Sequence, residues 1–298
     1  MRRRYFTLDV FTTQRFAGNP LAVVLDSDGL DTAAMQTIAR EFNLSETVFV
    51  FPPDASTSRA RVRIFTPANE LPFAGHPTVG TAVLLGGLDG GGERSFTLEE
   101  KIGPVPCRVT SSGAGRGRAS FDIPRVPAKE ADLPDTAAMA KAVGLTAADL
   151  GLGDLTAARW SAGNPFSFVP VRSLDAMRRC TVDLATFDRA FEGGGRSAAF
   201  LFCRETQDAG NDFHARMFAP SFGILEDPAT GSAVAAFAGY LAASGGYKDG
   251  THVVRIEQGY EMGRASLLEL TINLSGGKLT GASIAGDAVV VMEGTVEA

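Results

Sequence analysis

The chain has 298 residues, enough for two domains of ordinary size, and its 45% hydrophobic and 21% charged content is typical of a compact globular protein. Its 28 basic and 34 acidic residues give a net charge of −6, which excludes a nucleic-acid partner because no basic face is present. No apolar run approaches the roughly 18 residues of a membrane span and no signal peptide is visible, so we expect a cytoplasmic protein with no membrane partner.

The first half of the chain combines short strand-like segments with two helices. Strands are predicted over 5–11, 21–25, 47–51 and 61–65, where apolar residues alternate or run continuously. An amphipathic helix is predicted over 31–42, with Asp31 as its N-cap. A second, apolar helix is predicted over 78–85, after a turn formed by Gly75-His76-Pro77.

A segment rich in Gly, Ser, Pro and Ala, from about Ser111 to Asp135, marks the expected domain junction. We predict an N-terminal lobe over 1–125, which the last strand, 286–298, can complete, and a C-terminal lobe over 126–285. Further strands are expected over 251–257, 265–274 and 288–293.

Three motifs of the first half recur in the same order in the second half. They are Ala17-Gly18-Asn19-Pro20 and Ala162-Gly163-Asn164-Pro165, Arg63-Ile64-Phe65-Thr66-Pro67 and Arg216-Met217-Phe218-Ala219-Pro220, and Gly80-Thr81-Ala82-Val83 and Gly231-Ser232-Ala233-Val234. One such match is compatible with chance, but three matches in order at similar separations indicate a duplication with a pseudo-two-fold axis. Many short strands around few helices predict an α+β fold in each half, and not a doubly wound α/β sheet.

Each of the two apolar helices follows a segment that contains ionisable residues. These segments are Glu70-Leu71-Pro72-Phe73-Ala74-Gly75-His76-Pro77-Thr78 and Glu226-Asp227-Pro228-Ala229-Thr230-Gly231-Ser232-Ala233. A helix N-terminus exposes backbone N–H groups at the positive end of its dipole, so it can bind a carboxylate. If the duplication brings the two helix starts together, they define a pocket for a small carboxylated substrate. The alternative is that Thr78 and Asp227 simply cap the helices.

Glu46 is a third candidate, because it stands at the start of an apolar strand where glutamate is disfavoured. Burial favours the protonated form of a carboxyl group, which suits a group that transfers a proton near neutral pH. Taken alone, this position is better explained by a solvated glutamate at a strand end.

These motifs resemble those of the PhzF family, named after the phenazine biosynthesis isomerase. The resemblance is carried by Phe16-Ala17-Gly18-Asn19-Pro20, Leu44-Ser45-Glu46-Thr47, Phe73-Ala74-Gly75-His76-Pro77 and the segment from Glu226 to Ala233. It implies a diaminopimelate epimerase-like fold, in which each of two similar domains is a curved, mostly antiparallel sheet around a central helix. It also implies a homodimer and a reaction that needs neither a metal nor an organic cofactor.

The resemblance assigns roles to individual residues. Glu46 matches the glutamate that acts as general acid and base in the family, and His76 and Asp227 match its other two polar site residues. Gly75, Gly231 and Ser232 match substrate-contacting positions at the helix starts, and Asn19 and Thr230 complete the expected substrate-binding set.

The resemblance therefore predicts an isomerase that moves a proton on a small carboxylated substrate. One alternative is a non-catalytic protein that binds a small acid on the same fold, and another is an epimerase that acts through Glu46 and His76. A racemase that uses two thiols is disfavoured, because Cys107, Cys180 and Cys203 lie outside both helix starts. The three cysteines have no CxxC spacing and are expected to be buried thiols.

Overall fold

The computed structural model describes residues 1–113, 115–191 and 197–298. The internal contacts divide the chain into two compact units. Unit 1 comprises Met1–Pro124 and Ile284–Ala298, and unit 2 comprises Arg125–Ser283. Among the described residues, no helix is both long enough and apolar enough to cross a lipid bilayer.

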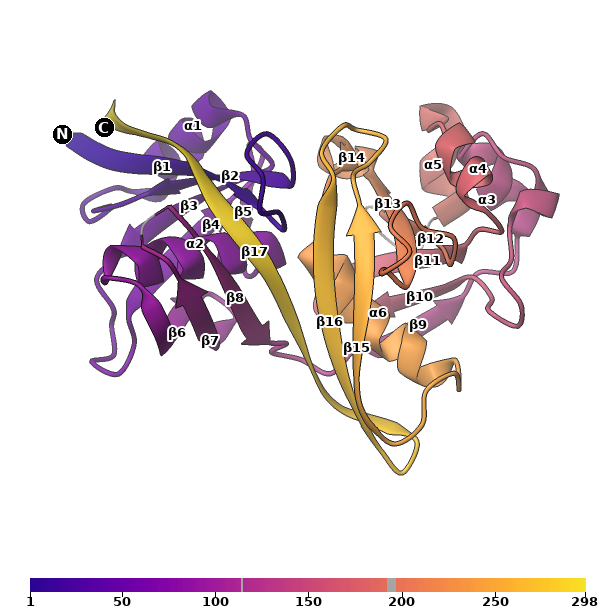
Figure 1. The fold of residues 1–298 in the computed structure, drawn as a ribbon. Helices are drawn as coiled ribbons and strands as arrows, with labels where there is room; N and C mark the ends of the chain where they lie inside the picture. The colour runs from indigo at the N-terminus through magenta and orange to yellow at the C-terminus, as the bar shows by residue number, and fades with distance from the viewer. Residues whose placement is uncertain (114, 192–196) are drawn as a thin grey trace. The chain divides into compact units, whose positions relative to one another are not determined.

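Unit 1 is a mixed sheet around one buried helix (Figure 1). Its elements are β1 (Arg2–Val10), β2 (Asn19–Val24), α1 (Thr32–Phe42), β3 (Glu46–Phe51), β4 (Ala60–Phe65), β5 (Glu70–Leu71), α2 (Gly75–Leu88), β6 (Gly92–Glu100), β7 (Gly103–Ser111), β8 (Arg116–Asp122) and the later part of β17 (Lys278–Glu297).

The strands of unit 1 combine antiparallel and parallel pairs. β1 pairs antiparallel with both β2 and β17, whereas β2 runs parallel to β3 and β4 runs parallel to β6. β6, β7 and β8 form an antiparallel meander. The central helix α2 contacts β1, β2, β3, β6, β7 and β8, and its residues Gly75–Gly87 are all buried, as expected for a helix that is apolar on every side.

Unit 2 is built in the same way around α6. Its elements are β9 (Ala128–Asp132), α3 (Thr136–Ala142), the 3-10 turn η1 (Ala147–Asp149), β10 (Ala158–Ser161), β11 (Pro165–Pro170), α4 (Leu174–Arg179), α5 (Leu184–Phe191), β12 (Ala199–Cys203), β13 (Phe213–Ala219), the 3-10 turn η2 (Pro220–Phe222), β14 (Ile224–Asp227), α6 (Gly231–Ala243), β15 (Gly250–Gln258), β16 (Ser266–Ser275) and the start of β17.

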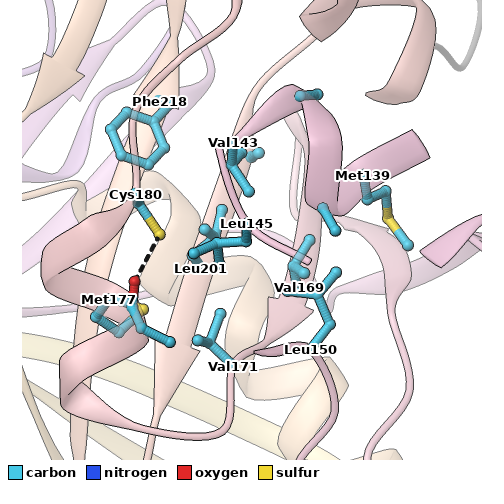
Figure 2. Close-up of a cluster of buried hydrophobic side chains, with 14 of the residues drawn as sticks. Met139, Val143, Leu145, Leu150, Val169, Val171, Met177, Cys180, Leu201 and Phe218 are labelled. Carbon is cyan, nitrogen blue, oxygen red and sulfur yellow. Dashed lines mark hydrogen bonds between the residues drawn. The ribbon is translucent and has the colours of Figure 1, made fainter. Parts of the chain in front are cut away.

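Two cores stabilise unit 2. Around α6, the rings of Phe168, Phe200, Phe202 and Phe213 surround Phe237 with centroid separations of 4.9–5.6 Å. A second cluster joins α3, α4 and α5 to the strands, and Figure 2 shows its aliphatic and sulfur-containing side chains, including Met139, Val143, Leu201 and Cys180. Cys180 donates its thiol proton to the Ala176 carbonyl, 3.4 Å away.

The repeated sequence motifs occupy equivalent places in the two units. The parallel pairs β2/β3 and β4/β6 of unit 1 correspond to β11/β12 and β13/β15 of unit 2. Arg63 forms a bidentate ion pair with Glu70, and Arg216 forms the same pair with Glu226, with Nε···Oε1 distances of 2.8 Å in both. The α+β class predicted from the pattern of short strands and few helices is confirmed.

One local prediction needs correction. The second helix begins at Gly75 and not at Thr78, because Pro77 falls in the first helical turn, where the missing N–H of proline is tolerated. In unit 2, His214 is a structural histidine that is fully buried between Glu257 (2.7 Å) and Glu261 (3.1 Å). Burial by itself lowers the pKa of His214, but these hydrogen bonds outweigh it and the net pKa is raised.

Candidate active site

Glu46 is the first residue of β3, and it is only 9% exposed. The parallel register of β2 and β3 places it beside Leu21, within a strand whose residues are all buried. Its Oε2 lies 3.3 Å from Nε2 of His76, which stands in the first turn of α2. The structure thus excludes a solvated strand-end glutamate, and it brings two of the predicted residues together.

The His76 ring is held as a neutral imidazole. Complete burial lowers its pKa to about 3, against the opposing effect of a hydrogen bond to the Pro20 carbonyl. Among the residues that the structure describes, Nε2 has no hydrogen-bond partner, so Nδ1 is the nitrogen that donates to Pro20. Nε2 therefore presents a lone pair towards the Glu46 carboxyl group.

The Ala17-Gly18-Asn19-Pro20 turn supplies this carbonyl. Asn19 begins β2 opposite Val10 and is fully buried. Gly18 has φ +66°, and a Cβ at this position would lie 2.4 Å from the Val10 carbonyl oxygen, so only glycine fits. The turn thereby fixes Pro20 and orients the imidazole of His76.

Asp227 belongs to unit 2 and lies at the end of β14, three residues before the N-cap of α6. Its Oδ2 accepts a 2.6 Å hydrogen bond from the Thr230 hydroxyl. Gln258, at the end of β15, donates from Nε2 to the Asp227 carbonyl at 2.7 Å and to the Thr230 hydroxyl oxygen at 3.1 Å, and its Oε1 accepts from the Thr230 amide. One fully buried amide side chain therefore holds the whole turn before α6.

Neither N-cap residue of the two central helices makes a side-chain capping hydrogen bond. The N-cap of α2 is Ala74, and the Thr78 hydroxyl donates to the Ala74 carbonyl at 2.8 Å. The N-cap of α6 is Thr230, which makes no side-chain capping bond, and its hydroxyl group donates to Asp227. Gly75 and Gly231 are the first helical residues, with Ser232 next to Gly231, so both helix starts present small residues.

Thiol chemistry does not fit the helix starts. Cys107, Cys180 and Cys203 lie on strands or after α4, and all three are buried and reduced. Burial raises the pKa of Cys107, and it raises the pKa of Cys180 and of Cys203 to about 12. Among the described residues, no group of three His, Cys, Asp or Glu side chains has the arrangement of a metal site.

Sequence reasoning missed Gln258 and its counterpart Glu100. The register of β13 with β15 places Gln258 beside Ala215, and the register of β4 with β6 carries Glu100 to the equivalent position in unit 1. The neighbouring residues Glu99 and Glu257 are also equivalent, because each carboxylate accepts hydrogen bonds from two backbone N–H groups of the loop before its partner strand. Glu99 accepts from the loop before β4, and Glu257 accepts from the loop before β13. The recurring dipeptides Glu99-Glu100 and Glu257-Gln258 were the available signal.

The chain is similar to known proteins over almost its whole length. The family model for phenazine biosynthesis-like proteins, PhzC-PhzF, matches residues 8–294. The chain is 48% identical to an uncharacterized isomerase of Mesorhizobium japonicum and 36% identical to the trans-2,3-dihydro-3-hydroxyanthranilate isomerase of Pseudomonas fluorescens, each over 98% of both proteins. The crystal structure of a PhzF-family phenazine biosynthesis protein from Bacillus anthracis superimposes with a TM-score of 0.89 over the whole of both chains, at 30% identity.

The fold and these relatives define an enzyme of the isomerase class. The chain belongs to the PhzF family of phenazine biosynthesis-like proteins. This membership favours catalysis over the alternative of a binding protein without activity.

Proposed function

We propose that the protein catalyses a proton shift between two carbons of a small carboxylated substrate, with Glu46 as the acid and base and without a cofactor. The observation that carries this proposal is the buried pair of Glu46 and the neutral His76, 3.3 Å apart at the start of α2. The relative from Pseudomonas fluorescens is named for trans-2,3-dihydro-3-hydroxyanthranilate, so we propose this compound, or a close carboxylated analogue, as the substrate.

The geometry explains how one proton can be removed and then returned. Glu46, as a carboxylate, takes a proton from one carbon and becomes a carboxylic acid. The Nε2 lone pair of His76 can then accept a hydrogen bond from this acid. Because burial keeps the pKa of His76 at about 3, the ring does not take the proton itself, and Glu46 retains it for delivery to the second carbon.

The remaining predicted residues are proposed to bind the substrate. The small residues Gly75, Gly231 and Ser232 allow a carboxylate to approach the first-turn amides of their helices. Asp227 and Thr230 are held by Gln258 and are proposed to orient a polar group, and the buried Asn19 is proposed to contact the substrate beside Pro20.

Reaction in D₂O tests the role of Glu46. We expect turnover of trans-2,3-dihydro-3-hydroxyanthranilate to incorporate solvent deuterium at the carbon that accepts the proton. Glu46→Gln should abolish both turnover and incorporation while the protein stays folded by circular dichroism. Unchanged turnover in this variant would exclude the mechanism, and inversion at a single carbon would identify an epimerase instead.

We also propose that the enzyme acts as a cytoplasmic homodimer, on the basis of the family resemblance. Light scattering coupled to gel filtration should give twice the mass of one chain. A mass of one chain at micromolar concentration would contradict this proposal.

A further inference from the structure

Glu100 has a buried carboxyl group that contacts the first turn of α2. It is the last residue of β6 and is 7% exposed. Its Oε1 lies 2.7 Å from the hydroxyl oxygen of Thr78, which is in the same helical turn as His76.

The hydrogen-bond geometry favours a proton on Glu100. The Thr78 hydroxyl has two close oxygen neighbours, the Ala74 carbonyl at 2.8 Å and the Glu100 carboxyl at 2.7 Å. A hydroxyl group has only one proton to donate, and a carbonyl oxygen can only accept. If Thr78 donates to Ala74, the second contact is a hydrogen bond only when Glu100 donates its own proton to Thr78.

The other oxygen of Glu100 supports the neutral form. Oε2 is buried and makes no hydrogen bond within the described part of the chain. An ionised carboxylate at such a position carries a large desolvation cost, whereas a carboxylic acid carries a much smaller one. Burial accordingly raises the pKa of Glu100 to about 8, and this effect outweighs the lowering that a hydrogen bond donated by Thr78 would cause.

Unit 2 has a neutral donor at the equivalent position. Gln258 donates its amide protons to the Thr230 hydroxyl oxygen and to the Asp227 carbonyl. Glutamine has the shape of a protonated glutamate and cannot ionise. In both units, therefore, a neutral hydrogen-bond donor contacts the start of the central helix.

We propose that Glu100 is a positioning residue that acts as a carboxylic acid: it holds Thr78 and the first turn of α2, and its ionisation weakens substrate binding. This inference rests on the proposed function, because it assumes that the start of α2 binds the substrate carboxylate. Ionisation of Glu100 removes the proton donated to Thr78. It also places a negative charge beneath the positive end of the helix dipole.

The other charged groups around Glu100 are engaged elsewhere. On β4, Arg61 lies 3.2 Å from Asp54, and Arg63 is paired with Glu70 of β5, which also contacts Lys101. Burial keeps His76 of α2 neutral, and burial raises the pKa of Cys107 on β7, so neither competes for the Glu100 proton near pH 8.

The first experiment detects the proton without using activity. The full-length protein is labelled with ¹³C at the glutamate side-chain carboxyl, and its NMR spectrum is recorded from pH 5 to pH 10. We expect one carboxyl resonance with a midpoint near pH 8 that is missing from Glu100→Gln. If every resonance lost in that variant titrates below pH 6, Glu100 is ionised at neutral pH and the proposal is wrong.

The second experiment tests whether ionisation of Glu100 weakens ligand binding. Affinity for anthranilate, a stable aromatic carboxylate, and kcat/KM for trans-2,3-dihydro-3-hydroxyanthranilate are measured from pH 6 to pH 9.5. From pH 7 to pH 9 the wild type should lose about tenfold in both quantities, with the change mainly in KM, because about one-tenth of Glu100 stays protonated one unit above its pKa. Glu100→Gln should remain active and lose this alkaline decline, whereas Glu100→Ala should bind weakly at every pH.

Glu99→Gln is the matched control, since Glu99 is adjacent on β6 but faces the amides of Asp54 and Ala55. It should keep the wild-type alkaline decline. An unchanged decline in Glu100→Gln would overturn the link between Glu100 and binding. Absence of turnover, together with a Glu100-dependent decline in anthranilate affinity, would instead contradict only the proposed reaction.

Discussion

Replacement of Glu100 by glutamine should stabilise the protein, and the gain should grow with pH. The pKa of the carboxyl group rises from its ordinary value of 4.5 to about 8 on folding, so between these values the folded protein binds a proton that the unfolded chain has released. The free energy of unfolding of the wild type therefore falls by about 1.4 kcal/mol per pH unit across this window. At pH 7 the accumulated cost is about 3 kcal/mol.

Glu100→Gln removes this cost but keeps a donor for Thr78. The difference in unfolding free energy between the variant and the wild type should increase by roughly 4 kcal/mol from pH 5 to pH 8. Below pH 4.5 it should reach a constant value that reflects only the exchange of an acid for an amide. Urea denaturation followed by tryptophan fluorescence and circular dichroism, at pH 5, 6, 7 and 8, measures this slope.

Glu99→Gln again provides the control. Two backbone amides lower the pKa of Glu99, so this group is ionised in both the folded and the unfolded chain above pH 5 and its replacement should give a pH-independent difference. A flat difference for Glu100→Gln over the same range would show that the buried carboxyl group does not hold its proton, and the reasoning would fail.

Two further predictions concern unit 2 and the thiols. Gln258→Leu leaves the Thr230 amide and the Asp227 carbonyl without their buried partner, so it should cost about 1–3 kcal/mol for each in denaturation experiments and reduce kcat/KM; retention of full stability and activity would contradict the role of Gln258. Because Cys107, Cys180 and Cys203 are buried and have raised pKa values, a thiol reagent such as iodoacetamide should leave isomerase activity unchanged in the native protein, and rapid inactivation would point to an essential thiol.

The motifs around the helix starts could be recognised from the sequence because they are local. Glycine is required at Gly18 by a positive φ and a close backbone contact, and Asp31 caps α1 through a hydrogen bond to the Ala34 amide, as its position before an amphipathic segment predicts. The sequence pattern predicts a start of α2 that is three residues late, because Pro77 resembles a helix breaker. In the first helical turn proline costs no hydrogen bond.

The buried polar contacts could not be predicted in the same way, because they depend on strand register. In the sequence, Glu100 ends a polar stretch of β6 and resembles an exposed residue. Only the parallel pairing of β4 with β6 and the packing of α2 against β6 bring its carboxyl group within hydrogen-bond distance of Thr78. The 3.3 Å separation of Glu46 and His76 likewise depends on how β3 packs against α2.

Comparison of equivalent positions in the two units distinguishes residues that stabilise the fold from residues that differ at the helix starts. Both units keep the same arginine–glutamate pair and the same glutamate that holds a loop, since these contacts stabilise the fold in either copy. The positions next to the helix starts have diverged: His76 and Asp227 each precede a proline, and Glu100 corresponds to Gln258. Because an amide already serves at this position in unit 2, a neutral donor is sufficient to hold a helix start. Any need for a glutamate at position 100 must therefore come from its ability to lose a proton, which is the property that Glu100→Gln removes.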